Sequence, residues 1–157
     1  MKYLLKYFTT IMAFIFISSC ARKENNINNK ASLSVLGDLP ENPLLFSPIT
    51  FSINPMKHSM STLYGNRSAI RYARINRNGF YPKGSILYEV TWKQKADSLW
   101  YGANIPSQII QVERVVFTGN HQHQYEIYTG NPLKKIPATF QTERTKFILS
   151  QRMVSTP

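Results

Sequence analysis

The chain has 157 residues, of which 19 are Lys or Arg and 8 are Asp or Glu, so its formal net charge at neutral pH is +11. The only cysteine is Cys20, which excludes an intrachain disulfide and any metal or iron–sulfur site built on several thiolates. The excess of positive charge favours anionic partners such as lipid head groups, acidic polymers or an anionic small molecule.

The first 20 residues have the pattern of a bacterial lipoprotein signal. Lys2 and Lys6 precede an apolar stretch over 7–17, which is shorter than the roughly 20 apolar residues that span a bilayer. Two serines then precede Cys20, whose sulfur we expect to receive a diacylglycerol once the signal peptide, residues 1–19, has been removed. Together with a further acyl chain such as palmitate, this would anchor the protein stably to a membrane. An ordinary signal peptide with a coincidental cysteine is the alternative.

The predicted location is therefore the bacterial cell envelope, with the domain outside the cytoplasm. Residues 20–40 are polar and rich in asparagine, and their composition predicts a flexible tether behind the lipidated cysteine. Residues 41–157 are long enough for one domain that buries an apolar core without disulfides. Nucleic acid is not an expected partner of an exported, tethered chain.

The domain is expected to begin with a strand and a helix. Residues 44–53 predict an edge strand, because Pro48 lacks a backbone donor and is excluded from the centre of a sheet. Residues 59–79 predict a helix that a serine caps at its start and that Gly79 ends. Small residues recur every four positions on one side of this helix and should let it lie close to a sheet: Gly65, Ala69 and Ala73.

Four arginines of the predicted helix form a single stripe. They are spaced four, three and three residues apart, which places them on one helical face: Arg67, Arg71, Arg74 and Arg77. Two interpretations are open, a solvated outer face or a surface that contacts anionic groups.

Three further strands and a second helix follow. The segments 84–94, 109–117 and 123–130 alternate apolar with polar residues or are rich in β-branched side chains. A turn at Gly119 should make the last two of these strands an antiparallel pair. The C-terminal helix is predicted from one apolar face, made of Phe140, Phe147 and Ile148. The predicted fold class is α+β, with an antiparallel β-sheet flanked by a few helices.

Histidines are the candidate ligands for a metal or a haem iron: His58, His121 and His123. If residues 121–123 are extended, two of these rings point to the same side, which suits a transition metal. The alternative for all three is that they are polar residues in turns. The metal, if any, is not specified by the sequence.

Few carboxylates are available for catalysis. Glu89 and Glu113 lie within apolar strands, where each could be an interior acid with a raised pKa, a solvated residue or the partner of an arginine. No serine stands in a nucleophile-elbow motif, and no glycine-rich phosphate loop is present. We therefore assign no catalytic residue. A pocket wall is predicted from aromatic side chains, for which core packing is the alternative: Trp92, Trp100 and Tyr101.

Residues 56–150 resemble the cytochrome P-460 family. The resemblance lies in an aromatic-x-Asn-x-x-Ala segment, here Tyr64, Asn66 and Ala69, followed by a Pro-x-Gly turn into a strand at Pro82 and Gly84. It implies an antiparallel sheet flanked by helices, often in a homodimer. In the best-known members this fold holds a c-type haem that oxidises hydroxylamine or binds nitric oxide.

This chain departs from that family at the haem attachment site. The resemblance implies a Cys-x-x-Cys-His segment near the C-terminus, and residues 21–157 contain no cysteine, so thioether attachment of haem is excluded. Two hypotheses follow. The domain is a non-catalytic ligand-binding module, or it binds haem without a covalent bond and acts as a redox or nitric-oxide-binding protein.

Overall fold

The structure is a computed structural model that describes residues 28–75, 80–119 and 122–153. The predicted signal peptide, Cys20 and the helix end predicted at Gly79 lie outside these residues, as do Arg77 and His121. Among the described residues, none of the helices has the length and hydrophobicity that crossing a bilayer requires.

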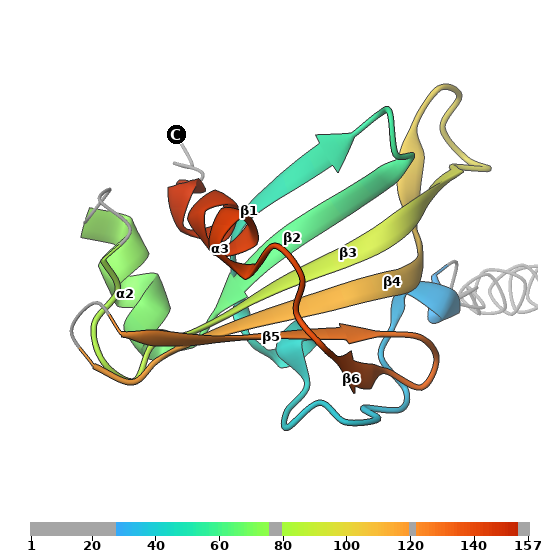
Figure 1. Ribbon diagram of the computed structural model, residues 1–157. Helices are drawn as coiled ribbons and strands as arrows, with labels where there is room; N and C mark the ends of the chain where they lie inside the picture. Colours follow the sequence, from blue (N-terminus) through green and yellow to red (C-terminus); the bar gives the residue numbers. More distant parts are fainter. Residues whose placement is uncertain (1–27, 76–79, 120–121, 154–157) are drawn as a thin grey trace, which may run out of the picture.

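One antiparallel sheet of six strands forms the centre of the molecule, and each strand pairs with its neighbour in sequence (Figure 1). The strands are β1 (Ser47–Asn54), β2 (Ser59–Gly65), β3 (Ile86–Ala96), β4 (Asn104–Phe117), β5 (His123–Thr129) and β6 (Lys134–Ile136). The helices are α2 (Arg67–Ile75) and α3 (Gln141–Ser150), with short 3-10 helices η1 (Asn29–Ala31) and η2 (Pro43–Leu45). The α+β class and the antiparallel sheet are thereby confirmed, as is the edge position of β1.

The two faces of the sheet are buried by different parts of the chain. The helical face bears Leu63, Leu87 and Val115, which pack with Ala69 of α2 and Ile148 of α3. The N-terminal face carries the side chains of alternate residues and packs beneath residues 31–46 (Figure 1). Its core side chains are Tyr88, Val90, Trp92 and Val112. Because both faces are covered, β3 is buried on both sides and its alternation of apolar and polar residues is weak.

Part of the segment assigned to the tether contributes to this second apolar cluster. Leu39 is buried, and Leu33 and Leu36 are partly buried against the same side chains. The Trp92 Nε1–H group donates to the Ala31 carbonyl oxygen at 2.9 Å. The packed domain therefore starts before residue 41, within the range predicted as flexible.

The helix predicted over 59–79 is wrong in its first third. Residues 59–65 form β2, whose side chains alternate between buried and half-buried with a period of two. The chain enters α2 only after Asn66, whose side-chain oxygen accepts from the Ala69 N–H at 3.0 Å, as an N-cap does. The serines at 59 and 61 are therefore strand residues. The four-residue spacing from Gly65 to Ala69, which favoured a helix, runs from the end of β2 into α2.

Close approach between α2 and the sheet holds as predicted, although Gly65 belongs to β2. A Cβ atom added at Gly65 would lie 2.9 Å from the Ala69 Cβ and 2.8 Å from Ile49 Cδ1. Contacts this short do not occur between real Cβ atoms, so α2 could not pack here against a larger residue.

The C-terminal helix is confirmed, but its predicted apolar face is not. Ile148 is fully buried against the helical face of the sheet, whereas Phe140 and Phe147 are exposed. Phe140 precedes α3 in a left-handed conformation, with φ of 57°. The side of α3 that meets the sheet instead carries Arg144, Thr145 and Ile148.

Candidate functional site

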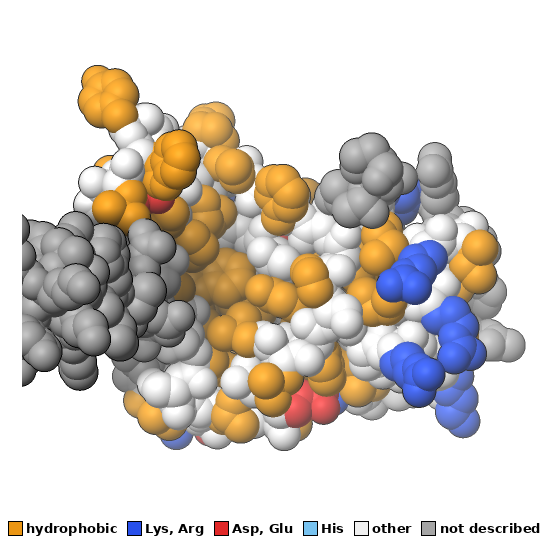
Figure 2. Space-filling model, turned by 180° about the vertical axis from the view of Figure 1, so that it is seen from behind, with side chains coloured by type: hydrophobic (Ala, Val, Ile, Leu, Met, Phe, Trp, Pro, Cys, Tyr) orange, Lys and Arg blue, Asp and Glu red, His pale blue; other side chains and the backbone are white. Residues whose placement is uncertain are grey.

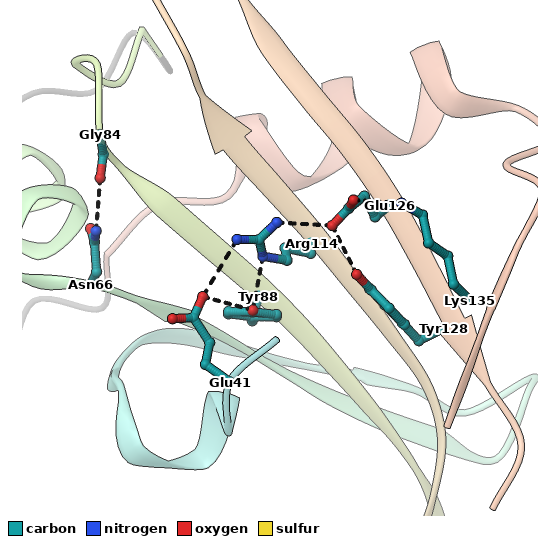
Figure 3. A network of polar contacts seen from close by, with 8 residues as sticks. All are labelled: Glu41, Asn66, Gly84, Tyr88, Arg114, Glu126, Tyr128 and Lys135. Atoms are coloured by element: carbon teal, nitrogen blue, oxygen red, sulfur yellow. Dashed lines mark hydrogen bonds and ion pairs between the residues drawn. The ribbon is translucent and has the colours of Figure 1, made fainter. Parts of the chain in front are cut away.

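The start of α2 is fixed by a single asparagine. The Asn66 backbone N–H donates to the Ile86 carbonyl at 3.1 Å, and its side-chain Nδ2 donates to the Gly84 carbonyl at 2.8 Å (Figure 3). Gly84 has a φ of +82°, a conformation that favours glycine, in the turn that leads into β3. Two segments singled out in the sequence, at Asn66 and Gly84, thus meet in one hydrogen bond that sets the direction of α2.

A groove beside α2 is lined by three of the four predicted stripe arginines. Arg67, Arg71 and Arg74 are exposed on α2, and they border a groove of about 520 Å³ whose opposite wall is Leu45, Phe46 and Ser47. Their exposure and shared face are as predicted, whereas Arg77 lies outside the described residues. We call this feature the arginine groove.

The electrostatics of the arginine groove favour an anion. No acidic residue lies in the first turn of α2, and no described carboxylate forms an ion pair with the three arginines. Arg67 is the first residue of α2, where the partial positive charge of the helix N-terminus makes a cation unfavourable. Figure 2 shows Lys and Arg side chains gathered at one end of the molecule. An anion would relieve this concentration of positive charge.

The described histidines lie far apart. His58 ends the turn between β1 and β2, and its carbonyl accepts from the Gln94 N–H at 2.9 Å. His123 begins β5 and pairs in register with Phe117, at the opposite end of the sheet. Both side chains are exposed, and no group of three or more potential metal-ligating side chains occurs among the residues that the structure describes.

The three predicted pocket aromatics separate into one core residue and two surface residues. Trp92 is 5% exposed and packs on the N-terminal face. Trp100 and Tyr101 lie in the turn between β3 and β4 and are exposed, at 71% for Trp100. Trp92 does line an apolar groove of about 440 Å³, together with Leu44, Phe51, Ile53, Met60 and Tyr64. Figure 2 shows hydrophobic side chains around a hollow on this face.

The two carboxylates singled out in the strands are buried side by side. Glu89 and Glu113 are 1% and 0% exposed, and they are register partners on adjacent strands beneath α3. Glu113 accepts from Arg144 Nε at 2.8 Å and Nη2 at 2.5 Å, and also from the Tyr125 hydroxyl. Of the interpretations left open for it, pairing with an arginine is the one that holds.

Among the described residues, no Lys or Arg forms an ion pair with Glu89. Its carboxylate accepts from Ser61 Oγ at 2.6 Å and from Gln151 Nε2 at 2.9 Å. Burial raises the pKa of Glu89 above its ordinary value, although the two hydrogen bonds act in the opposite direction. Every carboxylate oxygen of this pair has a partner among the described residues, which indicates a structural role under α3.

A second polar network, which was not predicted, lies on the N-terminal face (Figure 3). Arg114 donates to Tyr88 Oη and to Glu126, each at 2.9 Å, and lies 3.6 Å from Glu41. The Tyr88 hydroxyl in turn donates to Glu41 at 2.9 Å. The sequence signal that could have found this network is the adjacency of Glu113 and Arg114 on β4, which places two charges on opposite faces of one strand.

Glu126 is the most strongly stabilised anion of that network. Burial acts against its charge, but hydrogen bonds from Lys135, Tyr128 and Arg114 outweigh burial and hold its pKa at about 2. The Lys135 Nζ lies 2.6 Å from one carboxylate oxygen, and the Tyr128 hydroxyl donates to the other at 2.8 Å. The network ties β4, β5 and β6 to the segment before β1, so its role is also structural.

No protein-family model and no curated protein matches this chain. The resemblance to the cytochrome P-460 family therefore rests on the sequence motifs described above. Of the two grooves described above, the arginine groove is the one lined by several exposed cations that form no described ion pair, which makes it the candidate binding site.

Proposed function

We propose that the chain is an envelope lipoprotein whose domain is a non-catalytic module that binds an anionic ligand in the arginine groove. The observation that carries this proposal is the presence of Arg67, Arg71 and Arg74 around one groove, in a helix without an acidic residue. The ligand class is an anionic head group, polymer or small molecule with negatively charged oxygens, because guanidinium groups bind such oxygens in a bidentate fashion.

The absence of an assigned catalytic group in the described structure supports binding over catalysis. The buried carboxylates accept hydrogen bonds from Arg144, Ser61 and Gln151. The charged groups of the second network bind one another, as Arg114 binds Glu126. The arginine groove offers fixed charges, and its lining residues include no carboxylate, histidine or cysteine that could act as a base beside the Ser47 hydroxyl. Such a site can hold and orient an anion but supplies no proton transfer.

The resemblance to the cytochrome P-460 family is part of the proposal. We propose that the domain has the fold of that family and forms a homodimer, as the resemblance implies. The Asn66–Gly84 hydrogen bond supports the shared fold, because it joins the two motif segments and gives both a structural role that does not require haem. The homodimer rests on the resemblance alone.

The described residues do not fit a haem group. An axial ligand has to project into a slot that encloses the porphyrin. His58 and His123 are exposed, they lie at opposite ends of the sheet, and neither lines the grooves described above. The geometry of the described residues therefore supports the binding module better than a haem protein.

Membrane attachment is expected to depend on Cys20. Replacing Cys20 with serine removes the sulfur that takes the diacylglycerol, so we expect the variant to leave the membrane fraction or to accumulate as an unprocessed precursor. Fractionation and mass spectrometry of wild type and variant check this. Wild-type protein that is soluble and cleaved at another bond would contradict the anchor.

Anion binding is expected to depend on the arginine groove. Each cation close to an anionic surface contributes about 1 kcal/mol, so replacing Arg67, Arg71 and Arg74 with glutamine should weaken binding on the order of 100-fold. The measurement is calorimetric titration of the detergent-solubilised full chain with short-chain inorganic polyphosphate, at two salt concentrations.

A matched variant separates site from net charge. Lys30, Lys95 and Lys146 are exposed cations away from the groove, and their replacement with glutamine removes the same total charge. This control should lose far less affinity than the arginine variant. If circular dichroism shows both variants to be folded, equal losses of affinity would mean that the arginines form a solvated face without a specific role in binding.

A further inference from the structure

One end of the sheet carries four exposed large apolar side chains. They lie in two turns, at Met56 between β1 and β2, and at Leu99, Trp100 and Tyr101 between β3 and β4. Met56 is 93% exposed, and Tyr101 is completely exposed. Figure 2 shows hydrophobic side chains projecting from one end of the molecule, and the Lys and Arg side chains gather at the other end. We call these four residues the apolar turns.

The two turns belong to the same end of the sheet and are held there by hydrogen bonds. Ser59, just after the first turn, is the register partner of Lys93, and the Gln94 N–H donates to the His58 carbonyl at 2.9 Å. The second turn is closed by the Asp97 N–H, which donates to the Ala103 carbonyl at 2.9 Å, and Asp97 Oδ1 accepts from the Leu99 N–H at 2.8 Å. The apolar side chains are thus presented by ordered backbone.

The residue types in the apolar turns are those that proteins place at a bilayer surface. Trp and Tyr combine an apolar ring with a polar group and concentrate at the boundary between lipid head groups and acyl chains. Lys57 and Lys93 are exposed beside them, and lysine side chains reach lipid phosphates while their methylene groups remain near the apolar region.

The predicted anchor lies within reach of this end. The described chain begins at Asn28, and the Trp92–Ala31 hydrogen bond holds this segment against β3. Trp92 lies roughly 17 Å along the strand from the start of the second turn, at about 3.3 Å per residue. Asn28 is eight residues after Cys20, and eight extended residue steps span up to about 28 Å. A lipid on Cys20 can therefore enter the same bilayer that the apolar turns touch.

We propose that the apolar turns dock on the phospholipid bilayer that holds the anchor, with Trp100 and its neighbours in the head-group region. This inference rests on the membrane attachment proposed above. It also orients the molecule, because the arginine groove lies at the other end of β3. The eleven residues of β3 correspond to roughly 36 Å, several times the screening length of about 8 Å at physiological salt. The groove then faces away from that bilayer and takes its anion from the opposite side.

The two tryptophans allow a direct test on the full lipidated chain. In the Trp92→Phe variant, fluorescence reports Trp100, and in the Trp100→Phe variant it reports the buried Trp92. Each protein is reconstituted in zwitterionic phosphatidylcholine vesicles with and without brominated acyl chains, so that the arginine groove has no anionic lipid to bind. We expect Trp100 to be quenched about twofold or more with a blue-shifted emission, as for an interfacial indole, and Trp92 to be unaffected.

The outcomes separate docking from anchoring. If the protein floats with the vesicles but Trp100 is not quenched, the apolar turns are not a docking surface, and the lipid anchor is not contradicted. Quenching of a chain that mass spectrometry shows to lack acyl groups would support docking and refute the anchor. If Trp100 emission is blue-shifted in a dimer without vesicles, the apolar turns contact a second copy of the chain, and the bilayer-docking proposal is wrong. If Trp92→Phe does not fold, the difference between wild type and Trp100→Phe gives the same answer.

Discussion

Replacing Arg144 with alanine is expected to lower the free energy of unfolding by about 3–5 kcal/mol, because it leaves the buried Glu113 carboxylate without its cation. Glu113 is fully buried, and two of its hydrogen bonds come from this guanidinium. Only the Tyr125 hydroxyl would remain among the partners described for it. Urea unfolding followed by circular dichroism at neutral pH measures the change.

Two controls distinguish a buried ion pair from general damage to α3. Arg152 follows the helix and donates only to backbone carbonyls among its described contacts, so its replacement with alanine should cost less than about 1 kcal/mol. Replacing both partners, Glu113 with leucine and Arg144 with methionine, should recover most of the loss, because no unpaired charge remains. If this double variant is as unstable as Arg144→Ala, the explanation is wrong.

Replacing Arg114 with alanine is expected to cost about 3 kcal/mol at neutral pH, because Glu126 and Glu41 both lose a half-buried cation. The side chain of Arg114 is 16% exposed and contacts three acceptors. Lys135 also donates to Glu126 but is 53% exposed, so Lys135→Gln should cost less than about 1 kcal/mol. Thermal or urea unfolding of both variants checks the difference.

The same network predicts how stability changes with pH. The pKa of Glu126 is lowered from 4.5 to about 2 in the folded chain. A lowered carboxyl pKa contributes stability that is fully present above the unfolded value and is lost as the pH falls toward the folded value. Wild type should therefore lose stability between about pH 5 and pH 2. Arg114→Ala should lose less over that window, and a loss equal to that of wild type would contradict the role of Arg114.

The sheet could be predicted from the sequence because its signals are local. The strands β3, β4 and β5 follow from β-branched and alternating residues, and the turn at Gly119 correctly joins β4 to β5. The start of α2 was misplaced because Ser59 and Ser61 are also good N-cap residues. The choice between strand and cap is made by the neighbouring β3, which pairs with β2 along its whole length.

The candidate sites were predictable where they depend on one element and not where they depend on two. Three stripe arginines share a face because α2 is a helix, and the helix period is enough to place them. The partner of Glu113 is 31 residues away on α3, so no local pattern could indicate Arg144. The α3 face was misassigned for a related reason: Arg144 turns toward the sheet to pair with the buried Glu113, and the phenylalanines turn outward. Thr145 is buried on the same side, but its hydroxyl has no hydrogen-bond partner among the described residues.

The position of Arg144 in α3, after all six strands, has a consequence for biosynthesis. A chain emerges from the ribosome with its N-terminus first, and all six strands precede α3. Until the final helix has been made, the Glu89 and Glu113 carboxylates stand on an uncovered sheet face without Arg144 or Gln151. Like charges on adjacent strands disfavour closure of that sheet. This charge repulsion favours a sheet that closes only after α3 has been synthesised, which would suit the export proposed above.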